Sequence, residues 1–197
     1  MQIEPNTQHK MDEKLNKKVK RMLDQLGIPY EAVATLKDRN GQPMRGVAKA
    51  DMLLKVVQVV EGKADISTLP EEAAHFFVEV IKKANPELYD QMFNKITEFT
   101  VYDRVKDEYS KLDSYANNEN KLKDEAIGKL IAKEMVDQHL EDERIENLPW
   151  LKRWMAKMMR SIKQAFGQIF GDPYKTAAYQ MLHTDLSKYK KAVKDIN

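Results

Sequence analysis

The residues best suited to chemistry lie in one short run, Glu71-Glu72-Ala73-Ala74-His75. On a helix, residues i and i+4 project from the same face with their Cβ atoms about 6 Å apart. Glu71 and His75 can therefore hold one metal ion between them, because carboxylate and imidazole groups are ordinary zinc ligands. Glu72 takes the neighbouring position, where a general base would meet a metal-bound water. The spacing predicts a site for metal-assisted hydrolysis.

This run resembles the His-Glu-x-x-His helix of zincin metallopeptidases, with Glu71 in place of the first histidine. The surroundings are similar as well, because the short β-branched strand Val56–Val60 comes before the run and Thr68-Leu69-Pro70 opens its helix. A weaker similarity extends over about residues 45–175 and is to zincin-like domains of phage-encoded polyproteins and virion proteins. We therefore expect a zincin-like fold.

The resemblance implies a peptidase in which Glu71, His75 and Glu125 bind Zn²⁺ and leave the fourth position to water. Glu125 has the place of the glutamate that a later helix supplies in the gluzincin branch. Glu72 would take the proton of the water as it attacks a peptide bond. The strand Val56–Val60 would offer its edge to an extended peptide or protein substrate.

Two carboxylates and one histidine form a harder ligand set than two histidines and one carboxylate. Another divalent metal, or none, is therefore an alternative to zinc. The same resemblance allows a catalytically degenerate domain, or a non-enzymatic virion module that keeps the scaffold and contacts other virion or polyprotein domains.

The same residues also have ordinary structural roles open to them. Glu71 can form a capping box with Thr68, worth about 1 kcal/mol. Glu72 in the first turn complements the helix dipole. His75 can be a half-buried residue of an apolar helix, and Glu79 is a rival third ligand or a partner for the His75 ring.

The other three histidines carry no such pattern. His139 and His183 lie near expected helix ends, and we interpret both as surface residues. His9 falls in a polar segment that we expect to be a flexible tail.

A second feature is the run from Trp150 to Lys163, which holds five cations and no acid. Its apolar residues recur at helical spacing: Leu151, Trp154, Met155, Met158, Ile162, Phe166 and Phe170. Such a helix can lie on an anionic membrane or fill a groove of a partner. The simpler interpretation, which we favour, is that the stripe packs on the other helices of this chain.

Composition excludes several classes of protein. The 197 residues include no Cys, which excludes disulfide scaffolds, zinc ribbons and cysteine nucleophiles. The 33 Lys+Arg nearly balance the 31 Asp+Glu, so nucleic acid is not an expected partner. Neither a glycine-rich phosphate loop nor a Gly-x-Ser-x-Gly elbow occurs.

The hydropathy pattern bears on location. No apolar run approaches the roughly 20 residues of a membrane span. The first residues lack the apolar stretch of a signal peptide. We expect a soluble protein of the host cytoplasm or of a virion.

These motifs need elements to position them, and periodicity predicts mostly helices. We expect helices near residues 11–26, 69–84, 87–99, 101–115, 122–140, 150–170 and 174–193. The Asn40-Gly41 pair predicts a hairpin between residues 30–36 and 43–48, and Val56–Val60 is the best strand.

The expected fold class is α+β, mostly α, with a small hairpin or sheet near residues 30–60 followed by a helical body. A flexible tail (1–10), a core domain (11–145) and a helical appendage packed on the core (146–197) are the expected domains.

Overall fold

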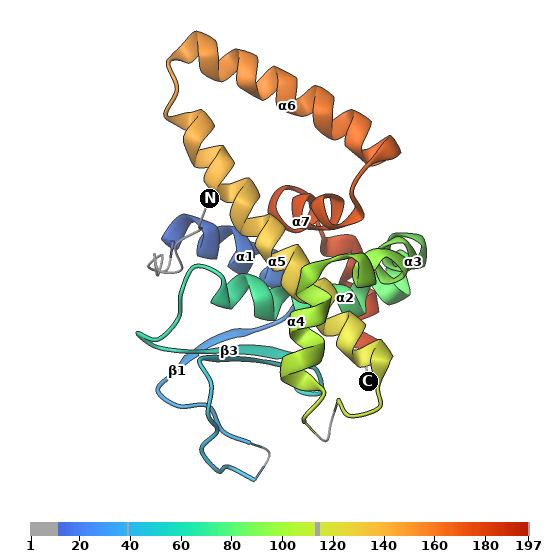
Figure 1. The fold of residues 1–197 in the computed structure, drawn as a ribbon. Coiled ribbons are helices and arrows are strands. Elements are labelled where there is room, and N and C mark those ends of the chain that lie inside the picture. Colours follow the sequence, from blue (N-terminus) through green and yellow to red (C-terminus); the bar gives the residue numbers. More distant parts are fainter. Residues whose placement is uncertain (1–11, 39, 113–114, 197) are drawn as a thin grey trace.

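The computed structural model describes residues 12–38, 40–112 and 115–196, and for residues 160 and 162–170 it describes the backbone. It confirms an α+β fold that is mostly helical (Figure 1). The helices are α1 (Glu13–Leu26), α2 (Thr68–Ala84), α3 (Pro86–Lys95), α4 (Thr100–Tyr109), α5 (Glu119–Glu146), α6 (Trp150–Phe170), α7 (Pro173–His183) and α8 (Lys190–Lys194). Two 3-10 turns, η1 (Ile96–Glu98) and η2 (Ser187–Tyr189), lie between them. The strands are β1 (Tyr30–Val33), β2 (Ala48–Asp51) and β3 (Val56–Val60).

Local capping explains where several helices begin and end. Asp12 accepts hydrogen bonds from the N–H groups of Lys14 and Leu15 and so begins α1. Gly27, at a φ of 74°, ends it in the left-handed conformation that glycine adopts without strain. The predicted first helix is confirmed, although its expected first residue, Met11, lies outside the described residues.

The predicted strand Val56–Val60 is confirmed, but its pairing differs from the expectation. β3 is the central strand, with β1 parallel on one side and β2 antiparallel on the other. Around Asn40-Gly41 the chain does turn back, yet the described residues of this loop form a single bridge, Lys37 to Pro43. The predicted hairpin is therefore wrong as a pair of strands, because Pro43 has no N–H to donate to a ladder.

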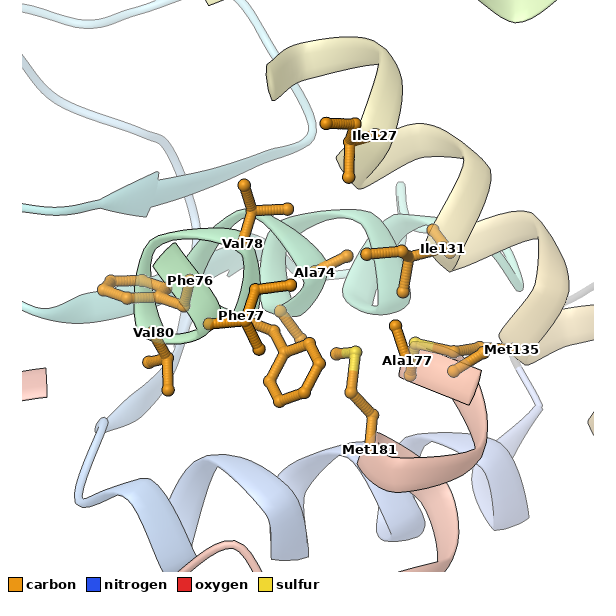
Figure 2. Close-up of a cluster of buried hydrophobic side chains, with 14 of the residues drawn as sticks. Ala74, Phe76, Phe77, Val78, Val80, Ile127, Ile131, Met135, Ala177 and Met181 are labelled. Atoms are coloured by element: carbon orange, nitrogen blue, oxygen red, sulfur yellow. The ribbon is translucent and has the colours of Figure 1, made fainter. Parts of the chain in front are cut away.

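The core is centred on α2, which packs between the sheet and the other helices. Figure 2 shows Ala74, Phe77 and Val78 on the side of α2 that faces α5 and α7, near Ile127, Ile131, Met135, Ala177 and Met181, and Phe76 and Val80 on its other side. Residues of α1 and α8 belong to the same core. The two helices that carry the predicted site residues are thus rigidly packed on each other.

Some helix bounds differ from those predicted, each for a local reason. α5 continues to Glu146 because the acidic run does not stop a helix, and Arg144 pairs with Glu141 within it. α4 ends at Tyr109 instead of residue 115. The predicted last helix is divided into α7, η2 and α8, and Asp185 turns the chain by accepting from the N–H of Ser187.

Helix α6 has the predicted bounds but not the predicted packing. It runs along one end of the molecule, away from the sheet, between α5 and α7 (Figure 1). Of its predicted stripe, the described side chains Leu151, Trp154, Met155 and Met158 are exposed. The prediction that they pack on the other helices is wrong, because α5 carries α6 beyond the core. No helix in the described part of the chain is long and apolar enough to cross a bilayer.

Candidate functional site

The close packing of α2 on α5 brings His75 to Glu125. A Cβ atom placed on Gly128 would lie 2.8 Å from Nδ1 of His75, so the imidazole rests directly on the α5 backbone. Any residue with a Cβ atom at position 128 would collide with the ring, so this contact requires glycine. Nε2 of the same ring lies 3.7 Å from Oε1 of Glu125. Two of the three predicted metal ligands therefore meet across 50 residues of sequence.

Glu72 lies half-buried in the same place, against the edge of the sheet. The backbone N–H of Ala50 in β2 donates a hydrogen bond to its carboxylate. Burial raises the pKa of the Glu72 carboxyl, and repulsion from Glu125 and Glu71 adds to this, whereas His75 and the Ala50 N–H oppose it. A carboxyl group with a raised pKa is suited to proton transfer near neutral pH.

Glu71 has a different partner from the one predicted. Its Oε2 lies 3.2 Å from Nζ of Lys129, and the same ammonium is 3.8 Å from Oε1 of Glu125. Burial lowers the pKa of Lys129, but Glu71, Tyr109 and Glu125 outweigh burial, and the net pKa is above its ordinary value. Lys129 therefore carries a full positive charge between two of the predicted ligands.

The predicted capping box between Thr68 and Glu71 is wrong. Asp65 caps this end of α2: its Oδ1 accepts from the backbone N–H of Thr68 at 2.9 Å and from the Thr68 hydroxyl at 2.7 Å. Because Asp65 accepts from the N–H groups at the start of α2, the Glu71 carboxylate is not needed as a cap and turns towards α5.

Two tyrosines complete the site and were not predicted. The hydroxyl of Tyr115 donates to Oε2 of Glu125 at 3.2 Å. Burial raises the pKa of Tyr115, and the charge of Glu125 raises it further, so the phenol stays protonated at neutral pH. Tyr109 lies beside it with its ring edge-on to that of Tyr115. Neither residue had a sequence signal, because both precede α5 in a stretch of weak pattern.

Lys129 was also missed, although a signal for it existed. It stands four residues after Glu125 on a predicted helix, which is the spacing of an intrahelical ion pair. The rival ligand Glu79 belongs to a separate network: Nζ of Lys82 lies 2.5 Å from Glu79 and 2.6 Å from Asp124, and the hydroxyl of Tyr89 donates to Asp124 at 2.8 Å.

A cavity of about 450 Å³ opens beside these groups. Its lining comes from β2, α2, α4 and α5 and from the segment before α5, and includes Lys49, Ala50, Glu72, His75, Tyr115 and Glu125. The prediction that Val56–Val60 offers a free edge to a substrate is wrong, because β3 is paired on both sides. β2 is the edge strand that borders the cavity. The bond from Ala50 to Glu72 means that this N–H points away from β3.

The residues present do not fit the predicted three-ligand metal set. Donor atoms around a tetrahedral zinc lie about 3.4 Å apart. His75 and Glu125 come close to this distance, but Glu71 is held by Lys129. In the described ranges no three His, Cys, Asp or Glu side chains converge as a group that could hold a metal ion.

The remaining histidines differ from one another. His139 is fully buried, with Nε2 3.0 Å from Oδ2 of Asp12, so the prediction of a surface residue is wrong. The approach of Asp12 to His139 is a long-range contact that sequence spacing does not reveal. His183 is exposed, as predicted. His9 lies outside the described residues.

The chain was compared with family models, with curated proteins and with solved structures, and none of the three comparisons finds a match. The function is therefore argued from the geometry of this site.

Proposed function

We propose that this chain is a zincin-like module that binds an extended polypeptide in the cavity between α2 and α5 without cleaving it. The observation that carries the proposal is the position of Lys129, 3.2 Å from Glu71 and 3.8 Å from Glu125. An internal ammonium supplies the positive charge that a zincin obtains from its metal. The resemblance to phage virion and polyprotein domains supports another domain of such an assembly as the bound polypeptide.

The cavity offers groups that recognise a peptide backbone. β2 is an edge strand, and an extended segment beside it can continue the sheet through main-chain hydrogen bonds. The Ala50 N–H is one such donor, now directed at Glu72. The Tyr115 hydroxyl and the carboxylates of Glu72 and Glu125 can bond to the other main-chain groups of the segment.

A second candidate function is the metallopeptidase itself. The approach of His75 to Glu125 and the raised pKa of Glu72 favour it. In that case His75 and Glu125 would be ligands and Glu72 the proton acceptor, with zinc or another divalent ion as cofactor.

Binding is tested with the immobilised full chain and a mixture of degenerate, unstructured decapeptides. Ala50→Pro removes the edge N–H, and we expect it to lower the retained peptide about fivefold, the equivalent of one hydrogen bond. Ala32→Pro is the matched control, because β1 pairs with β3 through the alternate residues Pro29 and Val33, which leaves the Ala32 N–H on the outer side. Equal retention by wild type and Ala50→Pro would contradict the proposal.

Cleavage is tested with casein in the presence of Zn²⁺ or Mn²⁺. The proposal predicts intact casein. Cleavage that Glu72→Gln abolishes and Glu79→Gln preserves would instead establish the peptidase, since both substitutions remove one acid of α2 that lines the cavity but Glu79 is paired with Lys82.

A further inference from the structure

Helix α6 presents an apolar surface that the other described residues leave uncovered. Trp150 is 72% exposed and Trp154 57% exposed, and Leu151, Met155, Met158 and Met159 are exposed as well. Large apolar side chains gathered on one helix are rare on a protein surface without a partner. The neighbours of α6 along the chain, α5 and α7, are its main contacts. This face therefore suits an occupant outside the described residues.

The charge of α6 indicates what that occupant is. The helix carries Lys152, Arg153, Lys157, Arg160 and Lys163 and no acid. At 100° per residue Lys152, Arg153 and Lys157 fall on the flanks and the side opposite the apolar stripe. A strongly amphipathic, cation-rich helix with Trp at its apolar face is the pattern of helices that lie in the headgroup region of a bilayer.

A second copy of this chain fits the face less well. Pairing two α6 helices through their apolar stripes would leave the cations on the flanks and outer sides of the pair, with no acid of α6 to offset them. An anionic surface, in contrast, is complementary to these cations. Two cations of α6 already pair with an anionic group: Glu146, at the end of α5, lies 2.6 Å from Lys157 and 3.7 Å from Arg153.

The arrangement of the molecule also suits a flat surface. α6 lies at one end of the molecule, and the sheet lies at the other (Figure 1). A plane can therefore approach α6 from the end of the molecule opposite to the sheet. We propose that α6 attaches this protein to the surface of an anionic membrane, lying in the interface without spanning the bilayer.

The chain contains its own probe for this attachment. Its two tryptophans, Trp150 and Trp154, both lie on α6, so tryptophan emission, excited selectively, reports on this helix alone. With vesicles of phosphatidylcholine and phosphatidylglycerol we expect a blue shift of the emission and flotation of the protein. Vesicles of phosphatidylcholine alone should give neither, and high salt should weaken both.

Two variants separate the apolar and the charged contributions. Met155→Glu places an acid in the stripe and should abolish flotation while it keeps both fluorophores. Lys152→Glu should lower the partition coefficient at least about fivefold, because each surface cation contributes about that factor to binding of anionic lipid. Leu54→Glu is the control: Leu54 is 70% exposed in the turn between β2 and β3, and flotation should not change.

Two results would overturn the proposal. One is the absence of both the blue shift and flotation with anionic vesicles at low salt. The other is a dimer in light scattering that Met155→Glu converts to a monomer, since a second copy would then be the occupant. Circular dichroism of each variant shows whether the fold is retained.

Discussion

Gly128 sets how closely the His75 ring approaches α5, and its replacement has a definite expected cost. In Gly128→Ala the new methyl carbon meets Nδ1 at 2.8 Å and Cε1 at 3.1 Å, both in a rigid ring. The cost of this clash should exceed the gain of about 1 kcal/mol that alanine brings in helix propensity. The net effect should be a decrease of about 1 kcal/mol in the free energy of unfolding.

A double-mutant comparison isolates this contact. In the background of His75→Ala the ring is gone, so Gly128→Ala should raise the free energy of unfolding, measured in urea. If Gly128→Ala stabilises both backgrounds equally, the close approach of the ring to α5 is wrong.

Glu72 predicts a pH dependence of stability. Because its pKa is raised in the folded state, the folded protein holds the proton more tightly than the unfolded chain does. The stability that this proton provides is present below the unfolded pKa and is lost as the pH rises through the folded pKa. Glu72→Gln, which keeps an acceptor for the Ala50 N–H, should therefore be more favourable to stability at pH 7.5 than at pH 4. Urea titrations at the two pH values test this, and a constant difference would contradict it.

At this scale the sequence predicted part of the site. The i, i+4 rule selected Glu71 and His75, and the resemblance added Glu72 and Glu125; of these, Glu72, His75 and Glu125 line one cavity. Neither could predict the partner of Glu71, because Asp65 took over the cap and Lys129 reached Glu71 from another helix. Gly128 had a weak signal, since a glycine inside a strong helix pattern indicates a close approach of backbone.

The attachment of α1 to α5 depends on a buried polar contact. Asp12 both caps α1 and lies 3.0 Å from the fully buried His139, and Lys14 and Lys18 pair with Glu143 and Asp142 nearby. Asp12→Ala removes the cap and the carboxylate that lies beside the buried imidazole, so we expect a loss of about 2 kcal/mol in the free energy of unfolding. The exposed Lys17→Ala should cost less than about 0.5 kcal/mol. Equal effects in urea denaturation would contradict this role.

Elements were predicted well where their signals are local. The bounds of α1, α2 and α6 follow from caps, prolines and periodicity. The pairing of β1 with β3 was not predictable in this way, because a parallel pair joins segments separated by a long connection. The β2–β3 hairpin was missed because Ala48–Asp51 has little β propensity and is a strand through its pairing with β3.

The molecule as a whole consists of a core around α2 and a helix, α6, that lies outside it. Native-state hydrogen exchange should reflect this division. The amides of α2 and the middle of α5 should open only with global unfolding, and those of α6 in the free protein should exchange at least about 100-fold faster. Equal protection of α6 and α2 would show that α6 packs in the core. From the sequence we favoured packing of α6 on the other helices. An apolar stripe alone does not show whether this chain or another surface covers it.

The central claim is that the ammonium of Lys129 takes the charge position of a metal beside Glu71 and Glu125. Calorimetric titration of the full chain with Zn²⁺ tests it most directly, with Lys129→Met as the variant that keeps length and loses charge. We expect no binding at micromolar Zn²⁺ for the wild type, and a gain of one site in Lys129→Met that a further His75→Ala removes. One zinc per wild-type chain, bound as tightly as by Lys129→Met, would contradict the claim.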